Sequence, residues 1–379
     1  MSDCKTVRLG DVATYINGYA FKPSDWGTEG LPIIRIQNLT GNDYETNFYN
    51  GKIPEKYFVK NGDVLISWSA SLGVYEWKKN DALLNQHIFK VVFDKLEVDK
   101  KYFMFTVSNL LNAMSKQTHG STMRHITKPD FDNMPFPLPP IEKQKQIARK
   151  LDKCNELILK NNRILEKYDL LIKSRFIEMF GDPVQNPMEW EVKKLGDICT
   201  KISDGVHAKP EYTATGKPFI SVVNINSGKL LFDDCKYVSE EAYEKMIKST
   251  HPEKGDILYT KVGATYGIPA LVDTDRAFCL YVSVALLKPK SEIVNSQFLT
   301  TSMAQPYIKN QADKRIKGIG VPDLHLNQIR EFEVLVPPLE LQNQFNSFVQ
   351  QIDKSKFAVQ KSLEKAETLY KSLMQEYFG

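Results

Sequence analysis

The fold of this chain follows from residues 139–181, which read PPIEKQKQIARKLDKCNELILKNNRILEKYDLLIKSRFIEMFG. Pro139 and Pro140 suit the entrance of a helix but not its interior, and Glu142 is favourable in a first turn. No Pro or Gly follows until Gly181. The stretch therefore predicts one uninterrupted helix of about 39 residues, or roughly 58 Å at ~1.5 Å per residue.

Apolar side chains recur along this predicted helix at alternating spacings of three and four residues. This heptad pattern is typical of a helix that packs against another helix. The expected helix-pairing residues in this stretch are Ile147, Leu151, Ile158, Leu165 and Ile172. Asn161 interrupts the apolar stripe.

The same pattern returns in residues 337–379, where Pro337 repeats Pro139 after 198 positions. Helix-pairing residues are expected there at Phe345, Val349, Ile352, Val359, Leu363 and Tyr370, with Lys356 as a polar break. Neither helix would be stable alone in water, so the simplest arrangement pairs them antiparallel. Asn161 and Lys356 then either fix the register of the pair or face water at a loose point.

The blocks that precede the two helices also repeat, but their offset drifts. Leu9-Gly10-Asp11 returns 186 positions later at Leu195, and Gly62-Asp63 returns 193 positions later at Gly255. This indicates two copies of a variable block, each followed by a scaffold segment of constant length. The predicted domains are 1–138 (first variable block), 139–182 (first helix), 183–336 (second variable block) and 337–379 (second helix).

Each variable block is predicted to be a mixed α/β domain. Short β-branched runs bounded by Pro or Gly are typical of strands, and they occur at 31–36, 64–68, 218–223 and 257–261. Residues 102–114 and 298–308 are expected to form the one short helix of each block. The predicted fold class is α+β: two mixed α/β domains separated by two long antiparallel coiled-coil helices, as a pseudo-twofold internal repeat.

The composition indicates a cytoplasmic protein. Lys and Arg number 50 against 46 Asp and Glu, and this net charge of +4 permits nucleic-acid binding without requiring it. No apolar run approaches the ~20 residues that span a bilayer, so we expect no membrane partner. The five Cys are widely scattered, which is typical of reduced thiols in a cytoplasmic protein.

The common catalytic motifs are absent from the sequence. We find no phosphate-binding loop, dinucleotide fingerprint, zinc-binding His pair or nucleophile elbow. The motif tetrad of adenine methyltransferases and the acidic metal-binding pattern of common nucleases are also missing. We therefore expect no catalytic residue and no metal site in this chain, and we interpret it as a binding protein.

The order and duplication of these features resemble the specificity subunit of type I restriction–modification systems. The segment from Gln117 through Ile126 to Pro140 is similar to the family's junction between a variable block and a helix. The segment 174–183, followed by Leu195-Gly196-Asp197, is similar to its junction between a helix and the next block. The resemblance covers essentially the whole chain.

The resemblance implies that each variable block is a target-recognition domain that reads one half of an asymmetric, bipartite site on double-stranded DNA. The paired helices would set the spacing and dock two methyltransferase subunits, and two restriction or motor subunits would complete the complex. S-adenosylmethionine, ATP and Mg would belong to these partners, which would perform adenine N6 methylation and ATP-dependent cleavage. This chain would hold no active site and no cofactor.

Two sets of residues are predicted to contact DNA. Glycine-flanked basic loops suit the approach to phosphates, and Arg can also read guanine, although a charged surface loop has the same composition. These basic residues are Lys116, His119, Arg124, His125 and Lys128 in the first block and Lys309, Lys314, Arg315 and Lys317 in the second. Polar loops near the start of each block hold the other set: Asn17, Phe21, Lys22, Asp204, His207 and Lys209.

Two other functions compete with DNA recognition. A coiled-coil scaffold with two terminal protein- or ligand-binding domains would have the same helices, but its binding would not depend on the charge of DNA. A nuclease or methyltransferase acting alone conflicts with the missing motifs. Salt-sensitive DNA binding separates the first alternative from the main interpretation.

Overall fold

The computed structural model describes residues 4–41, 46–117, 126–316 and 320–379. Its internal contacts divide the chain into two compact units. Unit 1 comprises Met1–Asn162 and Gln360–Gly379, and unit 2 comprises Arg163–Val359. Each unit therefore contains one variable block and part of each long helix.

The two long helices are α5 (Ile141–Phe180) and α11 (Leu339–Phe378), each 40 residues long. These bounds confirm the two uninterrupted helices that the sequence predicts. After α5, Gly181 adopts a φ of +78° and its N–H donates to the carbonyl of Ile177 at 2.8 Å. A glycine in this left-handed conformation satisfies a terminal carbonyl and ends the helix.

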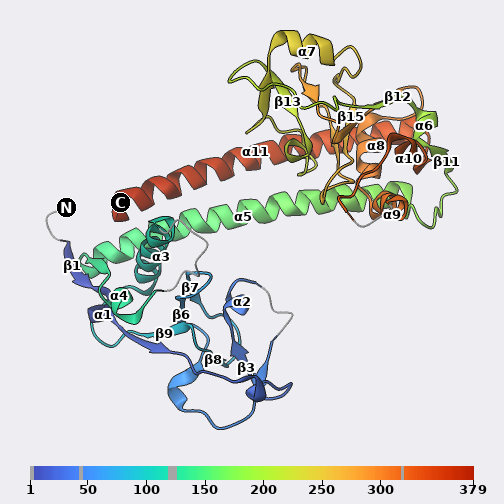
Figure 1. Ribbon diagram of the computed structural model, residues 1–379. Helices are drawn as coiled ribbons and strands as arrows, with labels where there is room; N and C mark the ends of the chain where they lie inside the picture. Colours follow the sequence, from blue (N-terminus) through green and yellow to red (C-terminus); the bar gives the residue numbers. More distant parts are fainter. Residues whose placement is uncertain (1–3, 42–45, 118–125, 317–319) are drawn as a thin grey trace. The chain divides into compact units, whose positions relative to one another are not determined.

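Unit 1 contains two four-stranded sheets and a two-stranded ribbon (Figure 1). The first sheet has the order β2-β9-β6-β7 and is antiparallel throughout, and the second sheet has the order β4-β3-β8-β5. The strands are β1 (Lys5–Arg8), β2 (Thr14–Asn17), β3 (Leu31–Ile34), β4 (Phe48–Tyr49), β5 (Phe58–Val59), β6 (Val64–Ser67), β7 (Gly73–Glu76), β8 (Ala82–Leu84), β9 (Ile88–Val92) and β10 (Pro135–Leu138). The helices are α1 (Leu9–Val12), α2 (Ile36–Leu39), α3 (Lys100–Gln117) and α4 (Lys128–Asp132), with 3-10 turns at Pro23–Asp25 and Glu55–Tyr57.

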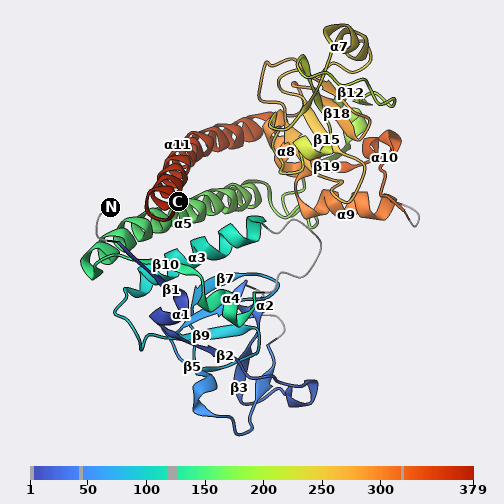
Figure 2. The same ribbon diagram turned by 60° about the vertical axis from the view of Figure 1, so that its left-hand side comes forward.

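The main core of unit 1 lies between the β2-β9-β6-β7 sheet, α3 and α5. Tyr15 and Phe89 from the sheet pack with Phe103 of α3 and Leu151 of α5 in one buried cluster. Figure 2 shows α3 between the first half of α5 and strand β7. Tyr370 of α11 packs against the same cluster, so both long helices cover this core.

Unit 2 repeats this architecture. Its sheets have the orders β12-β18-β15-β16 and β14-β13-β17, and β11 pairs with β19 as β1 pairs with β10. The strands are β11 (Glu191–Lys194), β12 (Cys199–Asp204), β13 (Lys217–Ile220), β14 (Lys236–Val238), β15 (Ile257–Thr260), β16 (Pro269–Leu271), β17 (Cys279–Leu280), β18 (Val284–Pro289) and β19 (Glu333–Val336). The helices are α6 (Leu195–Ile198), α7 (Glu240–Met246), α8 (Ser296–Met303), α9 (Pro306–Arg315) and α10 (Leu326–Arg330), with a 3-10 turn at Val222–Asn224.

The four predicted strand runs are confirmed as β3, β6, β13 and β15. The expectation of one short helix per block is wrong. The predicted helix 298–308 is split into α8 and α9 at Pro306, which begins a new helix because proline suits a first turn but not an interior. The other additional helices have four to seven residues, too few to produce a periodic apolar pattern.

All the predicted helix-pairing residues are buried or half-buried. Within unit 1, Lys150 contacts Tyr377 and Asn161 donates to Ser362 at 3.1 Å, so these segments of α5 and α11 run in opposite directions. Within unit 2, the ammonium of Lys356 lies 2.6 Å from Asp169. Asn161 is 5% exposed, so the alternative in which both polar breaks face water is wrong.

No helix in the described part of the chain combines the length and the apolar character that crossing a lipid bilayer requires.

Candidate nucleic-acid interface

In both units the chain leaves strand β2 or β12, the first strand of its sheet, through a glycine that lies against another backbone segment. A Cβ on Gly18 would lie 1.9 Å from the carbonyl oxygen of Asn85, and one on Gly205 would lie 2.0 Å from that of Leu280. Only glycine fits this approach. We call residues 17–22 and 204–209 the crossing segments, because there the chain passes to the second sheet of its unit, which contains β3 or β13.

The first crossing segment begins with a neutral polar pair. The indole Nε1 of Trp68, which follows β6, donates to Oδ1 of the exposed Asn17 at 3.2 Å. The Trp68 ring also stacks on Phe89, with 5.6 Å between the ring centroids. Asn17 therefore lies at the surface beside a half-buried aromatic group.

The second crossing segment begins with an ionic cluster instead. Lys261, which follows β15, places its ammonium 3.4 Å from Asp204 and 3.5 Å from Asp323. Nε2 of the exposed His207 lies 3.6 Å from the other oxygen of Asp204. The sequence predicts Asp204 and His207 as site residues but not Lys261 and Asp323, because residues 57 and 119 positions from Asp204 give no local signal.

The structure places Phe21 in a core and not at the surface. Its side chain is 6% exposed and packs against Tyr19 and Tyr49, with centroid distances of 4.9 and 5.3 Å. The predicted DNA contact through this ring therefore conflicts with its burial. Lys22 is exposed, and its backbone N–H donates to Asp25 at 2.7 Å.

Cations lie over aromatic rings near both crossing segments. In unit 1 the guanidinium of Arg35 lies 5.1 Å from the Trp26 ring, whose side chain is exposed. In unit 2 the ammonium groups of Lys209 and Lys236 lie 5.8 and 4.4 Å from the ring of Tyr212. Basic groups beside aromatic faces suit both phosphates and bases. The interleaving of aromatic and basic residues was the signal that would have identified Arg35 and Lys236.

The basic loop of the first block is only partly described. Lys128 begins α4, where its ammonium lies 2.6 Å from Asp132 and 5.3 Å from the Tyr15 ring. Lys116 lies in α3, but its side chain is outside the described part. The predictions at His119, Arg124 and His125 also lie outside the described residues, as does Lys317 of the second block.

The basic residues of the second block have different surroundings. Lys309 lies 3.8 Å from the Tyr266 ring and pairs with Asp313. Lys314 is exposed. Arg315 donates to the carbonyls of Gln311 and Glu331 at 2.9 and 3.1 Å, so its guanidinium closes the end of α9. Because of these two hydrogen bonds, the Arg315 guanidinium is less available to contact a base than the sequence predicts.

The Lys309–Asp313 pair is ionised at neutral pH. Burial disfavours the charge of Lys309, but hydrogen bonds to Asp313 and Tyr266 outweigh this effect, and the pKa of Lys309 lies above its usual value. The hydrogen bonds from Lys309 and Tyr266 lower the pKa of Asp313. Across the described ranges, no group of three His, Cys, Asp or Glu side chains is placed to hold a metal ion.

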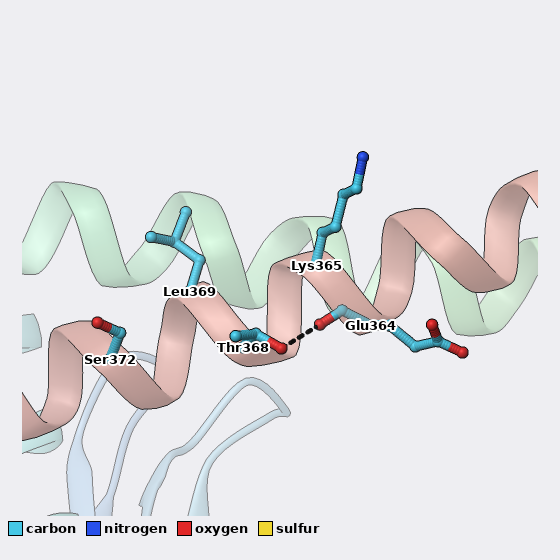
Figure 3. Close-up of a pocket in the computed structure, with 5 residues that line it drawn as sticks. All are labelled: Glu364, Lys365, Thr368, Leu369 and Ser372. Carbon is cyan, nitrogen blue, oxygen red and sulfur yellow. Dashed lines mark hydrogen bonds between the residues drawn. The ribbon is translucent and has the colours of Figure 1, made fainter.

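Exposed apolar side chains on the long helices also repeat with the 198-residue offset. Leu159 and Phe357 are 49% and 62% exposed, and Leu171 and Leu369 are 45% and 52% exposed. Leu369 lines an open groove of about 450 Å³ on α11, formed with Glu364, Lys365, Thr368 and Ser372 (Figure 3). Each helix therefore presents the same two apolar positions to solvent.

Comparison with known proteins gives a consistent result. The sequence model of the type I restriction modification DNA specificity domain matches residues 1–168 and 187–367. The chain is 25% identical to the type I restriction enzyme EcoBI specificity subunit of Escherichia coli, over 95% of this chain and 80% of that protein. It is 26% identical to the MjaVIII specificity subunit of Methanocaldococcus jannaschii, over 98% of this chain and 91% of that protein.

Two solved structures share the fold. The crystal structure of a type I restriction–modification S subunit from M. genitalium matches with a TM-score of 0.64 and 15% identity, over 100% of this chain and 96% of that one. A chain from a study of complex assembly and conformational transition in a type I system matches with a TM-score of 0.53 and 18% identity, over 100% and 98%.

Proposed function

The chain belongs to the family of type I restriction–modification DNA specificity subunits, and on this basis we propose a function for each of its parts. It is the non-catalytic subunit, and each of its two target-recognition domains reads one half of an asymmetric, bipartite site on double-stranded DNA. The repeated crossing segments carry this proposal. They have the same backbone path, but Asn17 and Trp68 stand in one where Asp204 and Lys261 stand in the other. Different side chains at equivalent places support a target with two unlike halves.

In this proposal α5 and α11 pair antiparallel along their length and set the spacing between the half-sites. The contacts of Asn161 with Ser362 and of Lys356 with Asp169 support this pairing in each unit. A helix of 40 residues is roughly 60 Å long, which is an upper bound on the separation. The two half-sites are then expected on one face of the DNA, about one helical turn apart.

The proposal also assigns two methyltransferase subunits and two restriction or motor subunits as partners. The methyltransferases supply S-adenosylmethionine and methylate adenine at N6, and the motor subunits supply ATP and Mg chemistry. The repeated exposed positions Leu159/Phe357 and Leu171/Leu369 support two equivalent docking faces. A solvent-exposed apolar patch that recurs by symmetry is typical of an interaction site.

Native mass spectrometry with a co-expressed methyltransferase subunit tests the docking faces. We expect Leu159→Glu or Phe357→Glu to reduce the complex from two methyltransferase copies to one, and the double variant to abolish it. Asn162→Glu and Gln360→Glu are the matched control, because both residues are exposed and related by the same offset. Two copies on the double variant would refute this docking surface.

Single-molecule methylation sequencing of host DNA tests the function itself. With the gene intact and its partner subunits expressed, we expect N6-methyladenine at one asymmetric, two-part motif, and deletion of the gene should remove it. An unchanged methylome after deletion would contradict the proposal and favour the scaffold alternative.

A further inference from the structure

Trp68 and Lys261 occupy the same position in the two recognition domains. Each directly follows its central strand, β6 or β15. The backbone N–H of Trp68 donates to the carbonyl of His87 at 3.3 Å, and that of Lys261 donates to the carbonyl of Ser283 at 3.0 Å. One backbone position therefore holds an indole in unit 1 and an ammonium in unit 2.

The same position anchors the segment that returns toward each long helix. The carbonyl of Trp68 accepts from the N–H of Ile126 at 3.2 Å, and the carbonyl of Lys261 accepts from the N–H of Leu324 at 2.9 Å. In unit 2 the contact continues, because Val262 forms a β-bridge with Asp323. Segment 320–324 thus lies beside the loop that begins at Lys261.

The side chain of Lys261 adds an ionic link to this backbone contact. It is 6% exposed, while its partners Asp204 and Asp323 are 15% and 45% exposed. A buried ammonium is stable only when it is paired, so both carboxylates are held toward it. Lys261 is thus more deeply buried than Asp323, and nearly half of the Asp323 side chain remains open to solvent.

A surface carboxylate in a DNA-reading domain has a restricted chemistry. Phosphates repel it, so it cannot serve as a backbone contact. It accepts hydrogen bonds, and the groups on bases that donate to it are exocyclic amino groups such as N4 of cytosine. Asp323 follows the predicted basic loop of the second block, where such a contact is expected.

We propose that Lys261 is a positioning residue that holds Asp323 to accept a hydrogen bond from the exocyclic amino group of a base in the half-site read by unit 2. At the position equivalent to Lys261, unit 1 has the uncharged Trp68, whose indole donates to Asn17. The inference rests on the proposed function, because it requires that unit 2 reads DNA. It adds to that function a residue that contacts a base, Asp323, and the residue that orients it, Lys261.

The test uses the full complex with its methyltransferase subunits and a plasmid library in which both half-sites are randomised. Methylated plasmids are then sequenced. We expect Asp323→Asn to change or relax the preferred base at one position of one half-site, by about tenfold or more. The other half-site should keep its sequence. Asp275→Asn is the matched control, because Asp275 is an exposed carboxylate paired with Lys254 at 3.1 Å in the same unit.

Variants of Lys261 separate positioning from a general loss of structure. We expect Lys261→Arg to retain the preferred base, and Lys261→Met to relax the same position as Asp323→Asn while the other half-site stays intact. An unchanged motif in Asp323→Asn would overturn the proposal. Equal loss of methylation at every library sequence, with the complex still assembled, would also overturn it, since the carboxylate would then not select a base. If the wild-type complex methylates no motif, it is the proposed function that fails.

Discussion

A buried glutamine joins the start of each long helix to its recognition domain. Oε1 of Gln144 accepts from the N–H of Asp99 at 2.9 Å, and its Nε2 donates to the carbonyl of Pro139 at 2.8 Å. Gln342 makes the equivalent bonds, to Asn295 and Pro337, at 2.8 and 2.7 Å. The side chain thus ties the Pro-Pro helix entrance to the start of α3 or α8.

Replacing this side chain should destabilise unit 1. Gln144→Leu leaves a buried N–H and a buried carbonyl unpaired, and we expect the free energy of unfolding to fall by about 2 kcal/mol or more. Gln146→Leu is the control, because Gln146 lies in the same turn of α5 but is exposed. Urea denaturation followed by tryptophan fluorescence measures both variants. Equal midpoints for the two would contradict this role.

The sequence predicts the role of a single residue only where the pattern of its neighbours in the chain carries that information. Gln144 and Gln146 both recur 198 positions later, as Gln342 and Gln344, so the repeat does not separate the buried glutamine from the exposed one. Lys261 and Asp323 were missed because their partnership with Asp204 depends on the sheet that brings them together. Phe21 was selected from a polar loop, yet its ring is in a core.

At the scale of elements, a polar contact lies inside the apolar seam of α5 and α11. The buried Asn161 donates to the half-buried Ser362 at 3.1 Å. A buried Asn in such a seam lowers stability but fixes the register of the two helices.

Asn161→Leu should therefore raise the melting temperature while loosening the choice of register. We expect a broader distribution of oligomeric states in size-exclusion chromatography and a higher midpoint in thermal denaturation. Asn162→Leu is the control, because Asn162 is exposed and adjacent. A lower melting temperature for Asn161→Leu, with a single oligomeric state, would show that the hydrogen bond stabilises the pair instead of specifying it.

Long periodic elements were predictable, and short ones were not. The spacing of apolar residues over ten turns specifies α5 and α11 without tertiary information. Helices of four to seven residues owe their conformation to the sheets around them, as α1 does where Leu9 donates its N–H to the carbonyl of Met134 at 2.8 Å. Pro306 was visible in the sequence, but its role as the start of α9 was not recognised.

At the scale of the whole molecule, the proposed spacer can be lengthened without changing either recognition domain. Seven residues that keep the heptad pattern are inserted after Asn162 and after Gln360, at the boundary between the units. This adds ~10.5 Å, or about three base pairs, so we expect the unspecified gap in the target to grow by about three base pairs.

Methylation sequencing reads this gap directly. The matched control carries the insertion in α5 alone, which prevents the two helices from keeping their pairing, and it should lose methylation. A target gap that stays the same after both insertions would show that the helices do not set the spacing.

The domain organisation could be predicted from the sequence because the chain contains two copies of the same pattern, which can be compared with each other. The helices recur at a constant offset of 198 residues, whereas the offset between the blocks varies along the chain. This difference distinguishes the constant scaffold from the variable part. The chemistry of recognition was not accessible in the same way. The proposed recognition depends on side chains that are distant in the sequence and meet at the crossing segments, and those side chains differ between the copies.

Independent reading of DNA by the two units is tested by exchanging one variable block for that of another family member with a known, different target. Residues 1–138 are replaced, and the methylated motif of the host is determined before and after. We expect one half of the motif to change to the donor's half-site, while the other half and the gap between them stay the same. A motif altered in both halves, or in neither, would contradict the independent reading of DNA by the two units.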